Sequence, residues 1–415
     1  MALLVLKFGG TSVASVEAIL HVANKVKALK EEGNRLAVVV SAMSGETNRL
    51  LDLASKFKVE KGKAVDFVLA TGEQVSVGLL CSALESIGVQ SYPMAGWQVP
   101  VQTDNSFGKA KITEIAPHNI TNLLDEGVVV ITGFQGVDRD NNITTLGRGG
   151  SDTSAVAIAA AISADECRIY TDVCGVYTTD PRVVSDARKL DVITYEEMLE
   201  LAGLGAKVLQ IRAVEFARNY NVKLRVLSTF EEDSGTLIID EEEGMGMEQA
   251  LISGITLQKN EARIMVSNVP DRPGIAADIL GPVAEKNIEV DMIVQNIGSN
   301  GIADFTFTVP KLDFDETVMI LKNLSSQLGG CIITGDDTIV KLSIVGVGMR
   351  SHAGIASKMF SVLAAENINI KMISTSEIKI SVVIEEKYAE LAVRCLHTAF
   401  ELEKTISGKN DLEVD

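Results

Sequence analysis

The sequence predicts an α/β protein built around a mainly parallel sheet with helices on both faces, followed by two smaller repeated units. Three observations support this fold class. Short apolar runs alternate with longer amphipathic ones through 1–240, an acidic stretch with two glycines interrupts this alternation at 240–249, and the remaining chain repeats itself at a fixed offset. Buried strands that alternate with helices are typical of a parallel sheet covered on both sides.

In the first part, β-branched apolar runs predict strands at residues 3–9, 36–42, 127–134, 167–172 and 223–228. Amphipathic runs predict helices at 12–32, through the stretch up to about residue 88, and at 152–163, 194–202 and 205–219. Ligands bind beyond the carboxyl ends of the strands in such sheets. The polar segments that follow the strands are therefore the candidate site: KFGGTS (7–12), SAMSGETN (41–48), TGFQG (132–136) and TDVCGVYTTDPR (171–182).

In the last part, each copy of the repeat reads as a small βαββα unit, with Gly274 matching Gly354, and Met292 matching Met372. The first copy continues into CIITGD (331–336), a fourth strand that the second copy lacks. The segment ISGITLQ (252–258) can supply that strand, which would nest the first unit within the second. We therefore expect a first domain over 1–240, a linker over 241–250, a first repeat over 262–337, and a second repeat formed by 251–261 plus 338–408.

Composition limits the classes of function. A hydrophobic share of 46%, a charged share of 23% and a net charge of −18 predict a globular enzyme of small molecules and argue against nonspecific binding to nucleic acid or anionic membrane. The start of the chain lacks the basic region of a signal peptide, so we expect a cytoplasmic protein. The five cysteines are spread without a CxxC motif and the four histidines are isolated, so we assign no metal site and no disulfide framework.

The segment 144–154, TTLGRGGSDTS, suits a small carboxylate. Gly149 and Gly150 leave the backbone bare at a predicted helix start, where unpaired N–H groups attract anions. Ser151 or Asp152 can cap the helix, and Arg148 adds a fork of donors that matches a carboxylate. The competing interpretation is a surface turn with an ordinary helix cap.

Two further segments suit a nucleotide. Lys7 and the glycines after it stand where backbone amides and a lysine can hold phosphates, although the Walker A pattern is absent. In the loop after residue 170, Tyr177 can stack on a base, Arg182 can reach phosphate, and Asp172 or Asp180 can hold Mg²⁺. The competing interpretation of the first segment is an ordinary strand-to-helix turn, and that of the second is a solvated loop. For Glu73 and Thr47 the competing interpretation is helix capping, and for Lys207 it is a surface position.

Together, KFGGTS, SAMSGETN, TGEQ (71–74), GFQG (133–136), TLGRGGSDTSA (145–155) and TDVCGVYTTDPR closely resemble the aspartate kinase family of the amino-acid kinase superfamily. VPDRPG, DMIVQN, VGVGMRSHAG and ISTSEIKISV resemble the paired ACT domains of its monofunctional members. The resemblance implies an amino-acid kinase fold followed by two ferredoxin-like βαββαβ ACT domains. It also implies transfer of the ATP γ-phosphoryl group to the β-carboxylate of L-aspartate, the first step toward lysine, threonine, methionine and diaminopimelate, with Mg²⁺.

The resemblance also assigns roles to residues. It implies that Lys7, Asp172 and Lys207 are catalytic. The substrate-binding residues it implies are Thr47, Glu73, Arg148, Gly149, Gly150 and Ser151, with Arg148 on the α-carboxylate and Glu73 on the ammonium group. The nucleotide-binding residues it implies are Lys7, Phe8, Gly9, Gly10, Ser41, Thr171, Asp172, Tyr177, Arg182 and Lys207.

For the repeated units, family likeness suggests feedback inhibition by lysine and threonine and a homo-oligomer formed through ACT domains. The effector-binding candidates are Asp271, Gly274, Ala276, Asp291 and Gln295; since Lys371 occupies the Asp291 position of the second copy, we expect the copies to bind differently. Met245 and Met247 leave open an internal start that gives a small regulatory subunit. We expect no fused dehydrogenase after the repeat.

Two alternatives stay open at this point. A kinase of the same superfamily that acts on glutamate, acetylglutamate or a nucleoside monophosphate would share the fold, but would not usually combine GRGGSDT with a duplicated tail. A noncatalytic amino-acid sensor would keep the fold without turnover. The intact set of Lys7, Glu73, Arg148 and Asp172 favours an enzyme.

Overall fold

The structure, a computed structural model, describes residues 1–415 except 60, 205–207, 241–251, 299–300, 351–353 and 405–415. Its contacts divide the chain into two compact units: unit 1 comprises Met1–Tyr177 and Lys189–Met247, and unit 2 comprises Thr178–Arg188 and Glu248–Asp415. The linker expected over 241–250, with Met245 and Met247, lies outside the described residues. The domain limits drawn from the sequence stay a prediction, and the contacts group Thr178–Arg188 with the second unit rather than the first.

Unit 1 is built on an eight-stranded sheet. The order is β10 (Val192–Thr194), β12 (Thr236–Ile239), β11 (Leu224–Ser228), β9 (Glu166–Thr171), β1 (Leu3–Phe8), β2 (Arg35–Val40), β6 (Val128–Thr132) and β3 (Ser91–Met94). Strands β10 and β12 run parallel to each other and antiparallel to the other strands, which are mutually parallel. The five strands predicted from the sequence are its five central members, β11, β9, β1, β2 and β6. The predicted mainly parallel α/β sheet is confirmed.

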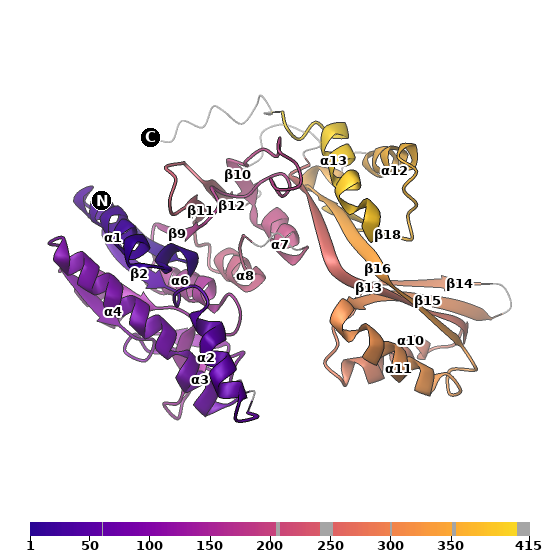
Figure 1. Cartoon of the computed structure of the whole chain (residues 1–415), viewed down its shortest axis with the longest axis horizontal. Coiled ribbons are helices and arrows are strands. Elements are labelled where there is room, and N and C mark those ends of the chain that lie inside the picture. Colours follow the sequence, from indigo (N-terminus) through magenta and orange to yellow (C-terminus); the bar gives the residue numbers. More distant parts are fainter. Residues whose placement is uncertain (60, 205–207, 241–251, 299–300, 351–353, 405–415) are drawn as a thin grey trace. The chain divides into compact units, whose positions relative to one another are not determined.

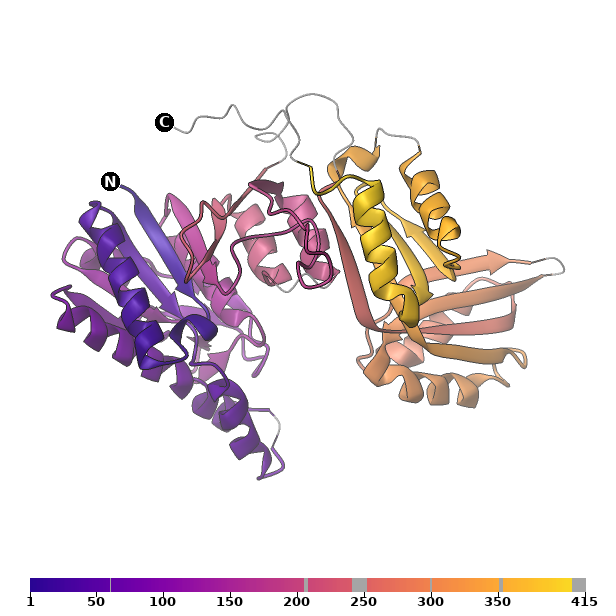
Figure 2. The same ribbon diagram turned by 45° about the horizontal axis from the view of Figure 1, so that its top comes forward.

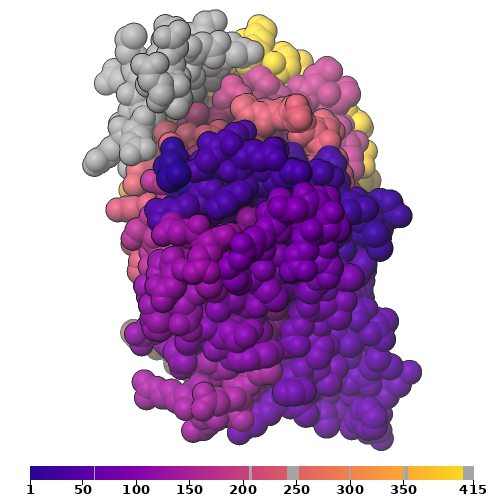
Figure 3. Space-filling model, turned by 90° about the vertical axis from the view of Figure 1, so that its left-hand side faces the viewer, coloured from indigo at the N-terminus to yellow at the C-terminus, as the bar shows by residue number. Residues whose placement is uncertain are grey.

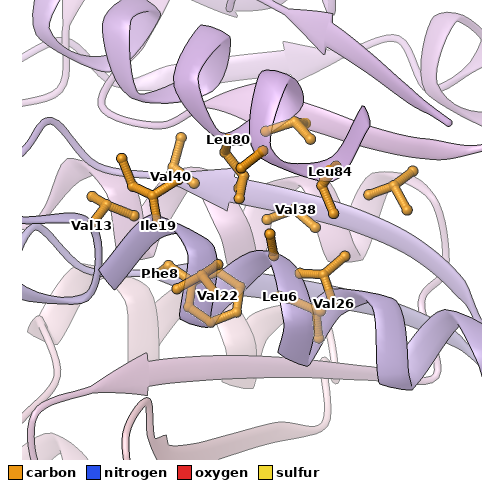
Figure 4. Packing of buried hydrophobic residues seen from close by; sticks show 14 of the residues in the cluster. Leu6, Phe8, Val13, Ile19, Val22, Val26, Val38, Val40, Leu80 and Leu84 are labelled. Atoms are coloured by element: carbon orange, nitrogen blue, oxygen red, sulfur yellow. The ribbon is translucent and has the colours of Figure 1, made fainter. Parts of the chain in front are cut away.

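The two faces of this sheet bury different helices because side chains alternate along each strand. Leu6 and Phe8 of β1 pack with Val38 and Val40 of β2 against α1 (Val16–Glu31) and α4 (Thr71–Ser86), which supplies Leu80 (Figure 4). The intervening residue Lys7 points to the opposite face, where α6 (Gly150–Ala161) lies against β1, β2 and β9 (Figure 1). Every residue of β1 is buried, which explains why the strand is apolar except for Lys7.

The remaining described elements of unit 1 surround this core. The helices are α2 (Glu46–Ser55), α3 (Lys63–Leu69), α5 (His118–Leu124), α7 (Tyr195–Gly203) and α8 (Ile211–Asn219), with a short 3₁₀ turn at Thr11–Val13. A separate four-stranded sheet, which the sequence did not predict, has the order β5 (Ile112–Ile115), β4 (Val101–Thr103), β7 (Gln135–Val137) and β8 (Ile143–Thr145). Within the described residues, one helical stretch, Lys63–Ser86, has the length and apolar composition of a membrane span, but half of it is buried inside the fold, as in a core helix.

Unit 2 contains one six-stranded sheet in the order β14 (Asp291–Ile297), β15 (Ile302–Pro310), β13 (Gly254–Pro270), β16 (Ile332–Val345), β18 (Lys379–Glu385) and β17 (Met372–Thr375). Helices α10 (Ile275–Ala284) and α11 (Phe314–Leu324) pack on the half formed by the first copy. Helices α12 (Ile355–Ala365) and α13 (Ala389–Ala399) pack on the other half (Figure 2). The two copies are thus joined side by side in a single sheet.

The two central strands of unit 2 belong to both copies. Residues Gly254–Gln258 of β13 pair antiparallel with Lys341–Val345 of β16, while Arg263–Ser267 pair with the earlier part of β16, Ile332–Asp336. The segment that the sequence analysis assigned to the second copy therefore lies beside a strand of that copy. The structure shows something the sequence did not: this segment and the first strand of the first copy form one continuous strand, as do CIITGD and the first strand of the second copy.

A hairpin connects the two units along the chain. Val176, Tyr177 and Thr178 pair with Leu190, Lys189 and Arg188 respectively. Beyond Thr178 the hairpin belongs to unit 2, where Val184 joins the apolar core and Thr178 Oγ1 lies 3.0 Å from Nε2 of the buried His397. The loop expected to bind a nucleotide is therefore continuous with a segment packed on the second ACT-like copy.

Candidate active site

The site lies at the carboxyl edge of the unit 1 sheet. The parallel strands β9, β1, β2 and β6 are neighbours, so the segments that follow them meet at one edge. Backbone hydrogen bonds tie these segments together: Gly9 N–H donates to Tyr170 O, Ser41 N–H to Phe8 O, and Gly133 N–H to Val40 O. This adjacency brings together four polar segments that lie far apart in the sequence.

Lys7 and Asp152 form the central ion pair of this edge. Lys7 Nζ lies 2.6 Å from Asp152 Oδ1, and both side chains are almost fully buried. Lys7 is the second-to-last residue of β1. Asp152 lies in the first turn of α6, where the helix N-terminus favours negative charge. The pair holds the ammonium group of Lys7 in front of the start of α6. Sequence reasoning offered Asp152 only as a helix cap and missed this contact.

Gly9 and Gly10 keep the loop after β1 close to its neighbours. A side chain on Gly9 would place its Cβ 3.4 Å from Lys7 Nζ, and one on Gly10 would place it 2.9 Å from Ala42 O. The backbone of the loop therefore lies next to the lysine on one side and to the segment after β2 on the other. Bare backbone beside a lysine is the arrangement that suits a phosphate chain.

Glu73 lies just behind this loop, inside α4. Its side chain is 2% exposed, and Oε1 accepts a hydrogen bond of 3.1 Å from Ala42 N–H, while Oε2 has no hydrogen-bond partner among the described residues. Burial raises the pKa of Glu73 to about 8, and the hydrogen bonds from backbone N–H groups only partly offset this effect. Because a buried carboxyl with a free oxygen needs a partner, the geometry favours a bound cationic group here.

The GRGGSD turn forms the other side of the site. Gly147 and Gly149 both have positive φ, and a Cβ on Gly149 would fall 1.7 Å from Cγ of Gln210, so only glycine fits there. Ser151 lies against Gly133, whose added Cβ would come within 2.7 Å of Ser151 Cβ. Arg148 itself is exposed and has no ion-pair partner among the described residues, so its guanidinium is available to a ligand.

The loop expected to hold the nucleotide is divided between the two units. Thr171 Oγ1 donates to Asp172 Oδ1 at 3.1 Å, and Asp172 is exposed at the end of β9. Tyr177 is half-buried, and its pKa is raised by burial and by the neighbouring Cys174. Arg182, by contrast, belongs to unit 2, where it forms an exposed ion pair of 2.8 Å with Asp180. The structure thus places Tyr177 and Arg182 in different units.

The other predicted site residues have plainer positions. The ring of Phe8 stacks on Tyr170 in the core, so only its backbone reaches the edge. Ser41 and Thr47 are partly exposed, Ser41 directly after β2 and Thr47 in the first turn of α2. Lys207 lies outside the described residues, and its role stays a prediction.

The sequence analysis did not single out Ser12. Its hydroxyl lies 2.6 Å from that of Thr229, directly after β11. The position of this serine in a predicted strand-to-helix turn was the feature of the sequence that could have pointed to it.

In unit 2, the effector candidates lie around the start of α10 and along β14. Gly274 caps α10 with a positive φ, next to the exposed Asp271 and the partly buried Ala276. Asp291 is ion-paired with Lys341, whereas Lys371 at the equivalent place in the second copy pairs with Asp336 at 2.5 Å. The charges of the two copies are therefore reversed. Gln295 is exposed on β14, and the described residues contain no group of three or more potential metal ligands in either unit.

Comparison with known proteins agrees with this architecture. Residues 2–228 match the model of the Amino acid kinase family, and residues 263–326 and 342–400 each match a model described as an ACT domain. The fold and the edge of the sheet define an amino acid kinase joined to two ACT domains.

The relatives are more specific. The chain is 60% identical over 408 residues to the aspartate kinase of Pseudomonas fluorescens, covering 97% of this chain and 98% of that one, and 58% identical over 405 residues to the aspartokinase of Pseudomonas aeruginosa, with the same coverage. Among solved structures, E. coli aspartokinase III in complex with aspartate and ADP matches with a TM-score of 0.78 and 27% identity, covering 96% of this chain and 100% of that one. The chain belongs to the aspartate kinase family, and its kinase unit carries that activity.

Proposed function

We propose that the enzyme transfers the γ-phosphoryl group of ATP to the β-carboxylate of L-aspartate and releases 4-phospho-L-aspartate. One observation carries the choice of substrate. The edge of the sheet presents a buried carboxyl with a free oxygen, that of Glu73 beside the segment after β2, and an exposed guanidinium, that of Arg148 in the glycine-rich turn before α6. A ligand with an ammonium and an α-carboxylate group satisfies both. E. coli aspartokinase III, solved with aspartate and ADP, supports the same pairing of ligands.

The chemistry needs alignment more than a base. A carboxylate is already nucleophilic at neutral pH, so catalysis reduces to positioning and to neutralising charge on the transferred group. Lys7, held by Asp152, and the N-terminus of α6 are the positive groups at hand, and Lys207 is proposed as a third. Gly9, Gly10, Ser41 and the segment Thr171–Tyr177 are proposed to hold the nucleotide, while Thr47, Gly149, Gly150 and Ser151 line the aspartate pocket.

The described residues near the proposed nucleotide segment offer Mg²⁺ few carboxylate ligands. It is usually held by one or two carboxylates together with nucleotide phosphates, and it neutralises charge on the phosphoryl oxygens. Asp172 is an exposed carboxylate at the end of β9, beside the proposed nucleotide segment, so we propose it as the protein ligand. Asp180 is already paired with Arg182 in unit 2 and is less suited.

Trapping of the acyl phosphate with hydroxylamine tests the proposed reaction. With ATP and Mg²⁺, L-aspartate should give a hydroxamate, whereas L-glutamate and N-acetyl-L-glutamate should give none. Turnover of either alternative at a comparable rate would contradict the substrate assignment. Nucleotide binding without hydroxamate from any of the three would favour a noncatalytic sensor.

We further propose that lysine and threonine inhibit the enzyme through the ACT domains, at a site that includes Asp271, Gly274, Ala276, Asp291 and Gln295. E. coli aspartokinase III has also been solved with lysine and aspartate, at a TM-score of 0.75 and 27% identity. The opposite charges at Asp291 and Lys371 support the expectation that the two copies bind ligands differently. Inhibition requires only that an effector prefer the less active state by a few kcal/mol.

Substitution of Asp291 tests the effector site. Asp291→Ala removes a carboxylate suited to an amino-acid ammonium group and releases Lys341, so inhibition by at least one of the two amino acids should weaken about tenfold or more. Initial rates at increasing lysine and threonine, singly and together, measure this. Inhibition by both that is as strong as in the parent enzyme would refute the placement.

The wider context follows from the reaction. We propose that the product feeds the synthesis of lysine, threonine, methionine and diaminopimelate in the cytoplasm, and that ACT domains pair the chain into a homo-oligomer. Whether Met245 or Met247 starts a separate small subunit is testable by immunoblotting for a second product of the same gene.

A further inference from the structure

Two residues determine where the glycine-rich turn of the candidate site begins. The turn, Gly147–Gly150, carries the exposed Arg148 and follows directly on Thr145 and Leu146. All four backbone polar groups of these two residues are hydrogen-bonded: two of them to neighbouring backbone and two to charged side chains. The charged side chains come from α3 and α8, which lie outside the turn.

Asp66 is the partner from α3. Its Oδ2 accepts hydrogen bonds from the Thr145 N–H at 2.7 Å and from the Gly108 N–H at 3.0 Å. Gly108 belongs to a loop that lies against the turn, since a Cβ on Gly147 would stand 3.0 Å from Gly108 O. One carboxylate oxygen thus joins the strand before the turn to the loop beside it. Helix α3 lies at the outside of unit 1 in Figure 1, and Figure 3 shows that outer surface, beneath which the side chain of Asp66 is buried.

Arg212 is the partner from α8. Its Nη1 donates to Leu146 O at 2.7 Å, and its Nη2 donates to Ala110 O at 3.1 Å. The fork of the guanidinium therefore spans the same two segments that the carboxylate joins. Gln210, the N-cap of α8, lies against Gly149 within the turn itself. The turn is thus held from one side by α3 and from another by the start of α8.

A buried acid is a costly means of stabilising a loop. Oδ1 of Asp66 has no hydrogen-bond partner among the described residues, and burial raises the pKa of this carboxyl group. Charged donors and acceptors do, however, make shorter and stronger hydrogen bonds than neutral ones. We propose that Asp66 and Arg212 are positioning residues for the substrate, because they hold the backbone from which Arg148 reaches the α-carboxylate of aspartate. This role rests on the proposed function, in which Arg148 binds that carboxylate.

Steady-state kinetics of hydroxamate formation test this role with a matched control. Asp66→Ala leaves two backbone N–H groups beside the turn without an acceptor, so the KM for aspartate should rise about tenfold or more, while the KM for ATP changes less than about threefold. Asp138 is also buried and accepts two backbone N–H bonds, but it lies in the loop that joins β7 to β8, at the other end of these strands. Asp138→Ala should leave the KM for aspartate near that of the parent. Equal rises in both variants would overturn the proposal.

A double substitution separates positioning from a general structural role. If Asp66 acts through Arg148, Asp66→Ala should raise the KM for aspartate less than about twofold once Arg148→Ala is present. A further rise of about tenfold in that background would contradict the role. Arg148→Ala alone should raise this KM. If it does not, the aspartate pocket is misplaced and the positioning role falls with it, whereas a rise for Arg148→Ala but not for Asp66→Ala removes the positioning role alone.

Two milder variants cover the case in which Asp66→Ala does not fold. Asp66→Asn keeps an oxygen that can accept both N–H groups, so its KM for aspartate should stay within about threefold of the parent value. Arg212→Met keeps much of the length of a partly exposed side chain but removes its donors, so its KM for aspartate should rise about tenfold. A KM like that of the parent in Arg212→Met would overturn the proposal, as would a tenfold rise in Asp66→Asn.

Discussion

Lys7 and Glu73 are both buried at the edge of the sheet, but their charges are compensated differently. Lys7 has a carboxylate partner at 2.6 Å, so its ammonium group is held in one place as part of a buried ion pair. Among the described residues, Glu73 accepts hydrogen bonds from backbone N–H groups only, so burial dominates and raises its pKa to about 8. This difference supports the proposed roles, in which Lys7 meets negative charge on the transferred group and Glu73 accepts a positive group from the ligand.

Lys7→Ala should therefore slow turnover far more than it weakens nucleotide binding. A donor aimed at charge that develops in the transition state is typically worth about 10²–10³ in kcat. Steady-state kinetics should show a kcat reduced by about that factor, with the KM for ATP changed only a few-fold. Asp152→Asn, which keeps the lysine, is the matched variant and should lose less. Equal losses in kcat and in nucleotide binding would contradict the role given to Lys7.

The raised pKa of Glu73 predicts that aspartate binding releases a proton. Since its pKa is about 8 in the free enzyme, Glu73 is mostly protonated at pH 7, and a bound ammonium group favours the ionised form. Aspartate binding at pH 7 should release up to one proton, and apparent affinity should rise with pH up to about 8 and then level off. Calorimetry in buffers of different ionisation enthalpy measures this. Glu73→Gln should abolish the release; an unchanged release in that variant would assign the proton to another group.

At the scale of elements, sequence patterns predicted what is buried and regular. The central strands are rich in apolar residues, and the polar segments after them do meet at one edge, as the rule for parallel sheets predicts. The four-stranded side sheet was missed because β4, β7 and β8 are too short to show a periodicity. The pairing of Lys7 with Asp152 was also out of reach, because residues so distant in the sequence meet only through the packing of α6 on β1.

The contact between the turn after β6 and the start of α6 should be intolerant of bulk. Gly133→Ala would push its new methyl group to within 2.7 Å of Ser151 Cβ, so the amino end of α6 must move. We expect activity to fall at least about tenfold while the fold is kept. Gly281→Ala, in α10 with open space around it, is the control and should leave kcat and the melting temperature nearly unchanged. Full activity in Gly133→Ala would show that the position of Ser151 is not critical.

The hairpin that runs from unit 1 into unit 2 depends on a buried hydrogen bond between Thr178 and His397. Thr178→Val keeps the shape of the side chain but removes this bond and also the acceptor of the Arg188 N–H, which should destabilise unit 2 by about 1–3 kcal/mol. Urea unfolding followed by circular dichroism measures the loss. Thr375→Val, at an exposed position in β17, should be close to neutral. Equal stability of both variants would mean that this bond does not fasten the hairpin.

At the scale of the whole molecule, the internal repeat correctly indicated a duplicated tail, and the family comparisons identify both copies as ACT domains. It did not reveal that β13 and β16 each run through both copies, since two strands that join end to end leave no turn residue to mark their border. There was also no sign in the sequence that Thr178–Arg188 groups with unit 2. Val184 packs in a core whose other buried residues all lie at or beyond Ile255, far along the chain.

We propose that the site holds aspartate by its ammonium and α-carboxylate groups and so presents the β-carboxylate for phosphorylation. Borohydride reduction of the freshly formed acyl phosphate, followed by chromatography of the products, tests this most directly, because it converts the phosphorylated carboxyl group into an alcohol. Reduction should give homoserine, the product of reduction at the β-carboxyl group. Recovery of 3-amino-4-hydroxybutanoate instead would place the phosphoryl group on the α-carboxylate and contradict the orientation given by Glu73 and Arg148.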